Sequence, residues 1–122
     1  MTIQEQYELL EKTVRGYNPA ADIAQIRAAF EFANEAHQEQ KRKSGEPYIT
    51  HPLAVAQIVA EELRLDSESI EAALLHDVIE DTAATEEQVA KLFSPTVAAL
   101  VEGVSKLTRI QYATKEDEQM EN

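Results

Sequence analysis

The sequence predicts an all-helical single domain, and three observations support this. The chain has 122 residues, the size of one domain or a piece of one. It contains only 3 Gly and 4 Pro, so few residues interrupt a helix. Apolar residues recur at spacings of three and four positions along most of its length. A chain of this size buries roughly two thirds of its unfolded surface, which is enough for a core.

Composition excludes several classes of function. The chain has no Cys, which rules out a disulfide framework, a thiolate zinc site and a cysteine nucleophile. No apolar run approaches the roughly 18 residues that span a bilayer, and the N-terminus lacks the features of a signal peptide. We therefore expect a cytoplasmic protein without a membrane partner. The net charge of −12 repels nucleic-acid phosphates, so no DNA partner is expected.

The first half of the chain predicts three helices. Residues 3–15 form a short amphipathic helix whose apolar side is Tyr7, Leu9, Leu10 and Val14. Residues 16–19 break it, and Asp22 starts a long helix over roughly 20–40. The core face of that helix is expected to be Ile23, Ile26, Phe30, Ala33 and His37. A lone histidine on an apolar face is more often a packing residue than a ligand, and we assign His37 that role.

A loop is predicted over 41–48, where Ser-Gly-Glu-Pro at 44–47 cannot continue a helix. Thr50 is the expected N-cap of the next helix, with Pro52 in its first turn. That helix should run to about Leu63. The side chains expected on its buried face are Leu53, Ala56, Val59 and Leu63.

The second half begins with a central helix over about Glu68–Ile79, capped by Asp66 or Ser67, whose inward side chains are Ile70, Ala73, Leu74 and Leu75. Residues 85–88 have the form of a capping box and predict a short helix to Phe93. Ser94, followed by proline, predicts another helix start, with an apolar face of Val97, Leu100, Val101 and Val104. Residues 107–113 should be irregular, and 114–117 resemble a further helix start. The chain stops soon afterwards, so we expect a fragment.

Residues able to bind a metal or move protons are concentrated at 74–82, Leu-Leu-His-Asp-Val-Ile-Glu-Asp-Thr. On a helix, His76 and Asp77 lie about 100° apart, and Glu80 and Asp81 follow them by one turn. If the first pair holds a metal ion, the second pair can steer a bound water. The alternative is a helix that ends in a solvated acidic cap beside one histidine. This stretch alone leaves both interpretations open.

His51 strengthens the metal interpretation. Two consecutive antiparallel helices bring the start of one near the end of the next, so His51 can join His76 and Asp77. Two imidazoles and a carboxylate suit manganese, iron or zinc better than calcium or magnesium. Just ahead of His51, residues 41–43 hold 3 of the 11 cationic residues. A metal ion, nearby cations and a Glu-Asp pair are what cleavage of a polyanionic phosphate ester requires.

Three segments carry a family resemblance. They are Arg-Lys-Ser-Gly-Glu-Pro-Tyr-Ile-Thr-His-Pro at 42–52, the His-Asp segment at 74–82, and Val-Glu-Gly-Val-Ser-Lys-Leu at 101–107. In this order and spacing they resemble the hydrolase (HD) domain of the long RelA/SpoT-type enzymes, the bifunctional guanosine tetra- and pentaphosphate synthetases/hydrolases (the GTP pyrophosphokinase family of the stringent response). The resemblance covers the chain from about Arg27 onward.

The resemblance implies an all-helical HD fold with one manganese ion and removal of the 3′-pyrophosphate from guanosine tetra- or pentaphosphate, giving GDP or GTP. It implies metal ligation by His51, His76 and Asp77. It implies that Glu80 and Asp81 are catalytic and position the attacking water. It also implies that the nucleotide is bound by Arg42, Lys43 and Ser44. For the full-length parent it implies association with the ribosome.

The sequence departs from the family at its C-terminal side. The family's fourth metal ligand is an aspartate in a later Asp-Arg-Leu-His-Asn motif that does not occur here, and Asp117 is not a substitute. We therefore expect a single partial HD domain over 1–122, with an N-terminal helix at 1–18 and the HD core from about 20, weak or inactive as a hydrolase. Uncovered apolar faces could also make it self-associate. The main alternative is a non-catalytic HD-like regulatory module that binds nucleotide or a partner.

Overall fold

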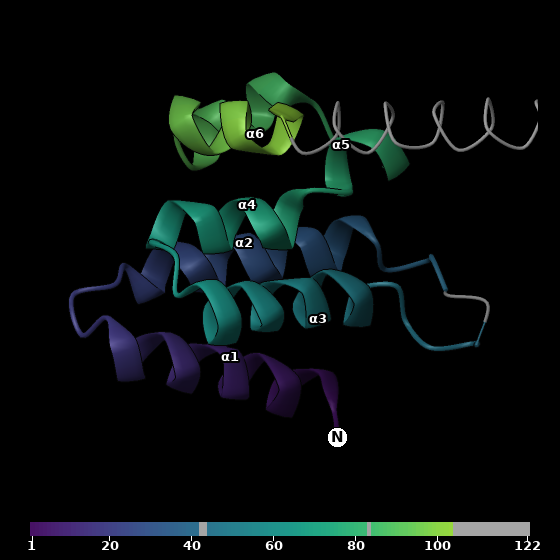
Figure 1. Cartoon of the computed structure of the whole chain (residues 1–122). Helices are drawn as coiled ribbons and strands as arrows, with labels where there is room; N and C mark the ends of the chain where they lie inside the picture. The colour runs from purple at the N-terminus through teal and green to yellow at the C-terminus, as the bar shows by residue number, and fades with distance from the viewer. Residues whose placement is uncertain (42–43, 83, 104–122) are drawn as a thin grey trace, which may run out of the picture.

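The computed structural model describes residues 1–41, 44–82 and 84–103, and it confirms an all-α fold in this part of the chain (Figure 1). The elements are α1 (Ile3–Tyr17), α2 (Ile23–Ala36), α3 (Thr50–Ile58), the π-helical segment η1 (Val59–Leu63), α4 (Ser67–Leu75), α5 (Val78–Asp81) and α6 (Glu86–Leu92). Residues 95–103 are also helical. The segments predicted at 107–113 and 114–117 lie outside the described residues, as does Val104.

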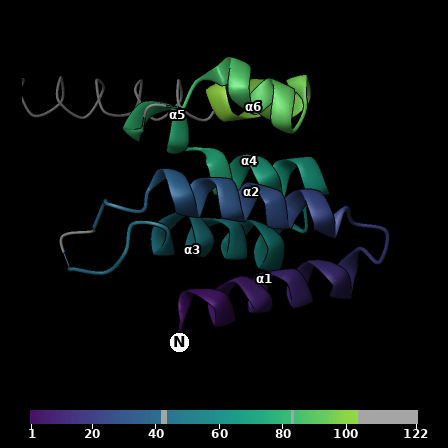
Figure 2. The same cartoon turned by 180° about the vertical axis from the view of Figure 1, so that it is seen from behind.

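Figures 1 and 2 show α2, α3 and α4 packed together, with α1 against α3 on one side and α6 beyond α4 on the other. The side chains at the centre come from every layer. Among the described residues, the larger fully buried apolar ones are Tyr7, Leu10, Val14, Ile26, Ile49, Leu53, Ile70, Leu74, Leu75, Val78 and Val89. Burial of each such side chain contributes about 1.5–3 kcal/mol, so this shared core holds the helices in register.

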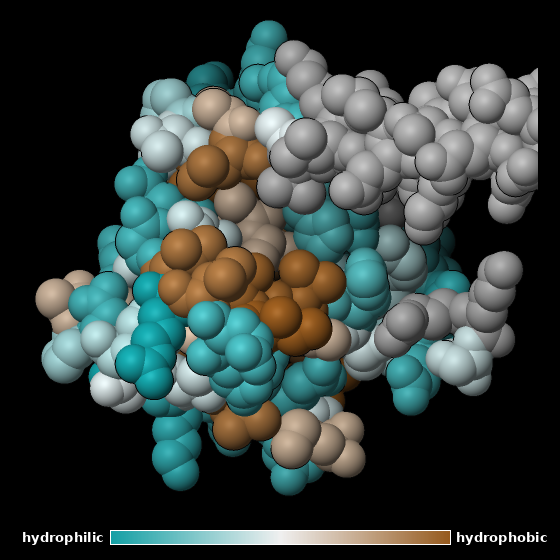
Figure 3. Space-filling view, viewed as in Figure 1, coloured by the Kyte–Doolittle hydropathy of each residue, from teal (hydrophilic) through white to brown (hydrophobic). Residues whose placement is uncertain are grey.

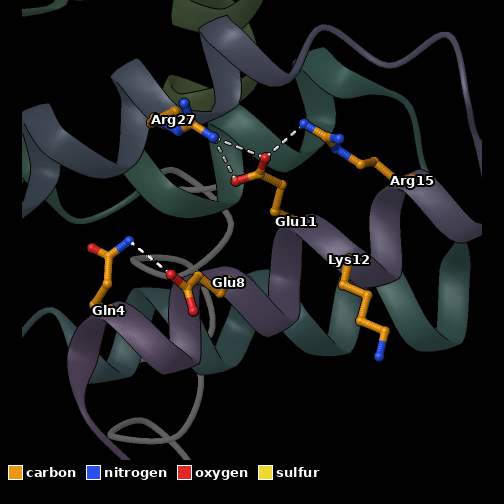
Figure 4. Close-up of a pocket in the computed structure, with 6 residues that line it drawn as sticks. All are labelled: Gln4, Glu8, Glu11, Lys12, Arg15 and Arg27. Carbon is orange, nitrogen blue, oxygen red and sulfur yellow. Dashed lines mark hydrogen bonds and ion pairs between the residues drawn. The ribbon is translucent and has the colours of Figure 1, made fainter.

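Helix α1 differs from the prediction at Leu9 and at its C-terminal end, because it continues through Gly16 to Tyr17 where a break over 16–19 was predicted. Tyr7 is buried and stacks on Phe30 of α2 with ring centroids 4.5 Å apart, whereas Leu9 is 41% exposed. Glu11 ties α1 to α2, because Arg27 donates to both of its carboxylate oxygens at 2.9 and 3.0 Å (Figure 4). Arg15 donates to Glu11 as well, at 2.8 Å. Predicting Leu9 as buried was wrong, because Leu9 lies outside the buried stripe of α1, which is formed by Tyr7, Leu10 and Val14.

Helix α2 starts as predicted and ends earlier. The Asp22 side chain accepts from the backbone N–H of Gln25, which caps the helix. The helix stops at Ala36, and His37 follows it at φ −96° and ψ 11°. His37 is 1% exposed, and its Nδ1 lies 2.8 Å from Oε1 of Gln40. It is therefore the buried, hydrogen-bonded packing residue that the sequence predicted.

Helix α3 differs from the prediction at both ends. Thr50 is the first residue of the helix and not its cap, because its hydroxyl donates backward to the carbonyl of Pro47 at 2.8 Å. The helix then widens into η1, and Leu63 is 61% exposed where burial was expected. A π-turn rotates the following side chains away from a 3.6-residue period, which accounts for the outward turn of Leu63.

The central helix is shorter than predicted, since α4 ends at Leu75 and α5 begins at Val78. Asp66 caps α4 as expected, accepting from the N–H of Ser69 at 2.9 Å. Later signals are also confirmed: Thr85 forms a capping box with Gln88, and Ser94 accepts from the N–H of Val97. The break at His76 and Asp77 is the main local departure from the sequence pattern.

Glu71 of α4 gives a prediction about stability. It is 3% exposed, and burial raises its pKa to about 7, helped by the negative charges of Asp22 at the start of α2 and of Glu68 and Asp66 in or beside the first turn of α4. The folded state holds this proton more tightly than the unfolded chain, so stability falls as pH rises from about 4.5 to about 7.

Glu71→Gln should therefore stabilise the protein at pH 8, by about 2 kcal/mol, and change little at pH 5. Urea unfolding at the two pH values measures the difference. Glu62→Gln, which removes an exposed carboxylate from η1, is the matched control and should show no such pH-dependent gain. Equal stabilisation by both variants would mean that net charge, and not burial of Glu71, is responsible.

Candidate functional site

Two helix ends meet at one side of the bundle. Helices α3 and α4 pack antiparallel, and Arg64, in the left-handed conformation at φ 49°, helps reverse the chain between them. The start of α3 therefore lies beside the end of α4. His51 is the second residue of α3, and His76 and Asp77 directly follow α4. The predicted convergence of these three side chains is confirmed as geometry, with one ligand-type atom from each lying within 4.8 Å of the other two.

One carboxylate oxygen is the centre of the group. Oδ2 of Asp77 lies 3.1 Å from Nε2 of His76 and 3.6 Å from Nε2 of His51. The two imidazole rings have centroids 5.7 Å apart. His76 and Asp77 are mostly buried, while the His51 side chain is 38% exposed. The group is thus open to solvent on the His51 side.

The tautomer of His76 suits a metal ligand. Its Nδ1 lies 2.6 Å from the carbonyl oxygen of Ala73, which can only accept, so Nδ1 carries a proton. In neutral imidazole, Nε2 then has a lone pair directed at the Asp77 carboxylate. Two lone-pair atoms at 3.1 Å repel unless a cation lies between them. A proton or a metal ion meets this requirement, and a metal ion could also bind His51.

Asp77 is held as a carboxylate. Burial acts to raise its pKa, but hydrogen bonds from His76 and Tyr48 and the charge of the histidines outweigh burial, so its pKa lies below the ordinary value. Its backbone, at φ −95° and ψ −8°, is in the sparsely populated bridge region where many active-site residues are found. The site therefore presents an anionic oxygen at neutral pH.

Tyr48 is a site residue that the sequence analysis did not single out. Its hydroxyl donates to Oδ2 of Asp77 at 2.9 Å, and its ring centroid lies 5.9 Å from that of His51. Its position three residues before His51, at the bend that starts α3, was the available signal. This tyrosine joins the loop before α3 to the end of α4.

The remaining predicted residues are only partly described. Glu80 and Asp81 belong to α5, which starts directly after Asp77, but their side chains lie outside the described part of the structure. Arg42 and Lys43 lie outside the described residues. Ser44 is exposed in the loop between α2 and α3, whose base is closed by the bond from Tyr48 N–H to Gln40 O at 3.0 Å. This loop emerges at the same end of the bundle as the His-Asp group (Figure 1).

Two other surface features lie near or beyond this group. Beside His76, a groove of about 300 Å³ runs between α3, α4 and residues 95–103, lined largely by apolar side chains of Val55, Val59, Leu65 and Leu100. Figure 3 shows apolar side chains gathered over α3 and α4 on this face. The second feature is a hollow beside α1, where Glu11 already pairs with Arg15 and Arg27 (Figure 4). None of the helices among the described residues is long and apolar enough to cross a bilayer.

Comparisons with known proteins agree with this geometry. Residues 29–122 match the family model described as "HD domain". The chain is 51% identical over 116 residues to the bifunctional (p)ppGpp synthase/hydrolase SpoT of Escherichia coli K12. It is 57% identical over 91 residues to the guanosine-3′,5′-bis(diphosphate) 3′-pyrophosphohydrolase of Haemophilus influenzae, and 43% identical over 120 residues to a GTP pyrophosphokinase of Brucella melitensis.

These relatives are much longer than the chain. The matches cover 95%, 75% and 98% of this chain but only 16%, 13% and 16% of the three relatives. A solved structure described as a metazoan ortholog of SpoT that hydrolyzes ppGpp is also similar, with a TM-score of 0.62 and 39% identity, covering 65% of this chain and 46% of that one. The family match implies a divalent metal ion, and the His-His-Asp group fits one.

Proposed function

The chain belongs to the HD domain family, and on that premise we propose that it is part of a cytoplasmic, manganese-dependent hydrolase that removes the 3′-pyrophosphate of guanosine tetra- and pentaphosphate. Three relatives whose names include this activity or its substrate align over most of the chain. Because the chain spans 16% of the length of the first of these, the activity is proposed for this chain and not transferred to it.

Within this proposal, His51, His76 and Asp77 hold the ion. A bound Mn²⁺ would polarise a phosphate oxygen and lower the pKa of a coordinated water. Nδ1 of His76 is fixed by the Ala73 carbonyl, so in the neutral ring Nε2 carries the lone pair that would bind the ion. The nitrogen and oxygen donors favour manganese, iron or zinc over calcium or magnesium, and the resemblance selects manganese among them.

The polar groups around the ion take separate roles. Glu80 and Asp81 are proposed to orient the attacking water and to take its proton as it attacks the phosphorus attached to the 3′ oxygen. The bond between that phosphorus and the 3′ oxygen breaks, pyrophosphate leaves, and the 3′ oxygen takes up a proton to become a hydroxyl. Arg42, Lys43 and Ser44 are proposed to bind the nucleotide, with the cations forming charge-assisted hydrogen bonds to phosphate. The net charge of −12 makes this local positive charge important for a polyanionic substrate.

The observation that carries the proposal is the convergence of three donor atoms on one point, at the end of the bundle where the loop carrying Ser44 emerges. A solvated acidic helix end, the alternative interpretation of the sequence, would not bring His51 from another helix to within 3.6 Å of Asp77. It would also not bury His76 against a backbone carbonyl.

The test measures pyrophosphate release from guanosine tetraphosphate with added Mn²⁺. We expect little release from the 122-residue chain, because its described residues supply three protein donors and the family's fourth ligand motif is absent from its sequence. Release should rise strongly in a version extended by the segment that follows the aligned region in the Escherichia coli relative.

The same experiment distinguishes the proposed hydrolase from the alternative, a non-catalytic regulatory module. If the extended protein binds Mn²⁺ and guanosine tetraphosphate but releases no pyrophosphate, the non-catalytic regulatory module is the better description. Release of phosphate from unrelated nucleotides at equal rates would contradict the proposed substrate. A version of the extended protein with Mn²⁺ removed by a chelator is the control and should be inactive.

We also propose two associations: self-association of this chain, and binding of the full-length parent to the ribosome. Ile58, Leu63 and Leu65 are 58%, 61% and 40% exposed, and such an apolar surface supports self-association of the chain. Sedimentation over a range of concentrations tests this, and a constant monomer mass would contradict it. Association with the ribosome is proposed for the full-length parent alone, on the resemblance.

A further inference from the structure

We propose that Tyr48 is a positioning residue of the metal site, whose hydroxyl fixes the Asp77 carboxylate in the orientation that binds the ion. The proposal rests on the metal site proposed above. It adds a residue that neither the sequence pattern nor the family comparison assigned. Its basis is a set of contacts around Tyr48 that couples the loop before α3 to the end of α4.

The first contact is with the central oxygen of the site. The Tyr48 hydroxyl donates to Oδ2 of Asp77 at 2.9 Å. This is the same oxygen that lies 3.1 and 3.6 Å from the two histidine Nε2 atoms. A carboxylate rotates readily about its terminal bond, and this rotation would turn Oδ2 away from the imidazoles. The hydroxyl holds one oxygen in place and leaves its remaining lone pair for a cation.

The second set of contacts fixes Tyr48 itself. Its backbone N–H donates to the carbonyl of Gln40 at 3.0 Å, which closes the base of the loop. Its ring packs near two histidines, with the centroid of His37 at 4.7 Å and that of His51 at 5.9 Å. Because His37 is 1% exposed and bonded to Gln40, the ring rests on a fixed surface. The hydroxyl is therefore already placed before an ion arrives.

This arrangement has a consequence for metal affinity. A ligand held in its binding orientation loses less conformational freedom when the ion binds, which strengthens binding. Residues that orient metal ligands in this way typically contribute about 10- to 100-fold to affinity. Tyr48 acts through Asp77 and is assigned no contact with substrate. Its expected effect is therefore on Mn²⁺ affinity.

The test compares Tyr48→Phe with Tyr17→Phe in the 122-residue chain. Both variants lose one hydroxyl that donates a hydrogen bond, and both keep the ring. The Tyr17 hydroxyl donates to the Leu65 carbonyl at 2.6 Å, at the opposite end of α4 from His76, so it is a matched control. Isothermal titration with Mn²⁺ should show affinity about tenfold or more weaker for Tyr48→Phe. Tyr17→Phe should bind Mn²⁺ as the unmodified chain does.

Thermal unfolding distinguishes a role of Tyr48 in orienting Asp77 from a contribution of its hydrogen bond to the stability of the fold. Without metal, the two variants should melt at similar temperatures, since each lacks one hydrogen bond. With Mn²⁺, the rise in melting temperature should be smaller for Tyr48→Phe alone. Unchanged Mn²⁺ affinity in Tyr48→Phe would overturn the proposal and leave the metal site standing. Absence of Mn²⁺ binding by the unmodified chain would overturn the metal site, and the role of Tyr48 with it.

Discussion

Replacing Asp77 with asparagine is expected to lower the affinity of the chain for Mn²⁺ by more than about 100-fold, beyond the usual effect of losing an orienting residue. Asp77 supplies the anionic oxygen at the centre of the group, which lies near Nε2 of both His51 and His76. An amide oxygen carries no charge and attracts a divalent ion far less. Titration of free Mn²⁺, followed by calorimetry or by electron paramagnetic resonance, measures the loss.

Asp66→Asn is the matched control for this experiment. Asp66 caps α4 at the end opposite His76, and asparagine caps helices about as well as aspartate. The variant makes the same chemical change elsewhere in the chain, so Mn²⁺ affinity should stay as it was. If Asp77→Asn and Asp66→Asn bind the ion equally well, the ion is bound by other groups and the proposed centre is wrong.

The convergence of the proposed metal-site residues could be predicted because it depends on helix order. Two helices joined by a short reversal must pack antiparallel, which places residue 51 beside residues 76 and 77. Helix starts at Asp22, Asp66 and Thr85 were equally predictable, since a capping side chain acts within three residues. Local chemistry and chain order therefore gave the framework of the fold.

Other features could not be predicted, because they depend on contacts between distant residues. The hydrogen bond from Tyr48 to Asp77 joins positions 29 apart, so the closeness of Tyr48 to His51 in the sequence does not identify Asp77 as its partner. The helix break at His76 and Asp77 opposes an apolar run that favours a continuous helix. The exposure of Leu63 follows from the π-turn in η1, which a 3.6-residue period does not anticipate. In each case tertiary structure outweighed local preference.

Substituting either acidic residue of α5 should separate catalysis from metal binding. Glu80→Gln and Asp81→Asn, made in the extended protein that is proposed to hydrolyse guanosine tetraphosphate, are expected to lower kcat by about 10²- to 10⁴-fold, the usual contribution of a general base. Mn²⁺ affinity should change by less than about threefold, because neither residue is assigned as a ligand and only ligands and their orienting groups alter affinity strongly. Pyrophosphate release and Mn²⁺ titration on the same samples measure both effects.

This prediction has a matched control on α6, and the position of α5 defines what each outcome would mean. Glu87→Gln removes an exposed carboxylate from the first turn of α6, on the next helix along the chain, and should leave both quantities unchanged. Because α5 starts at Val78, directly after Asp77, its residues stay within about one turn of the proposed metal ligand Asp77. Such closeness permits either role, water positioning or ligation. Loss of Mn²⁺ binding together with turnover would therefore assign Glu80 or Asp81 to the ion, and retained turnover would remove them from the mechanism.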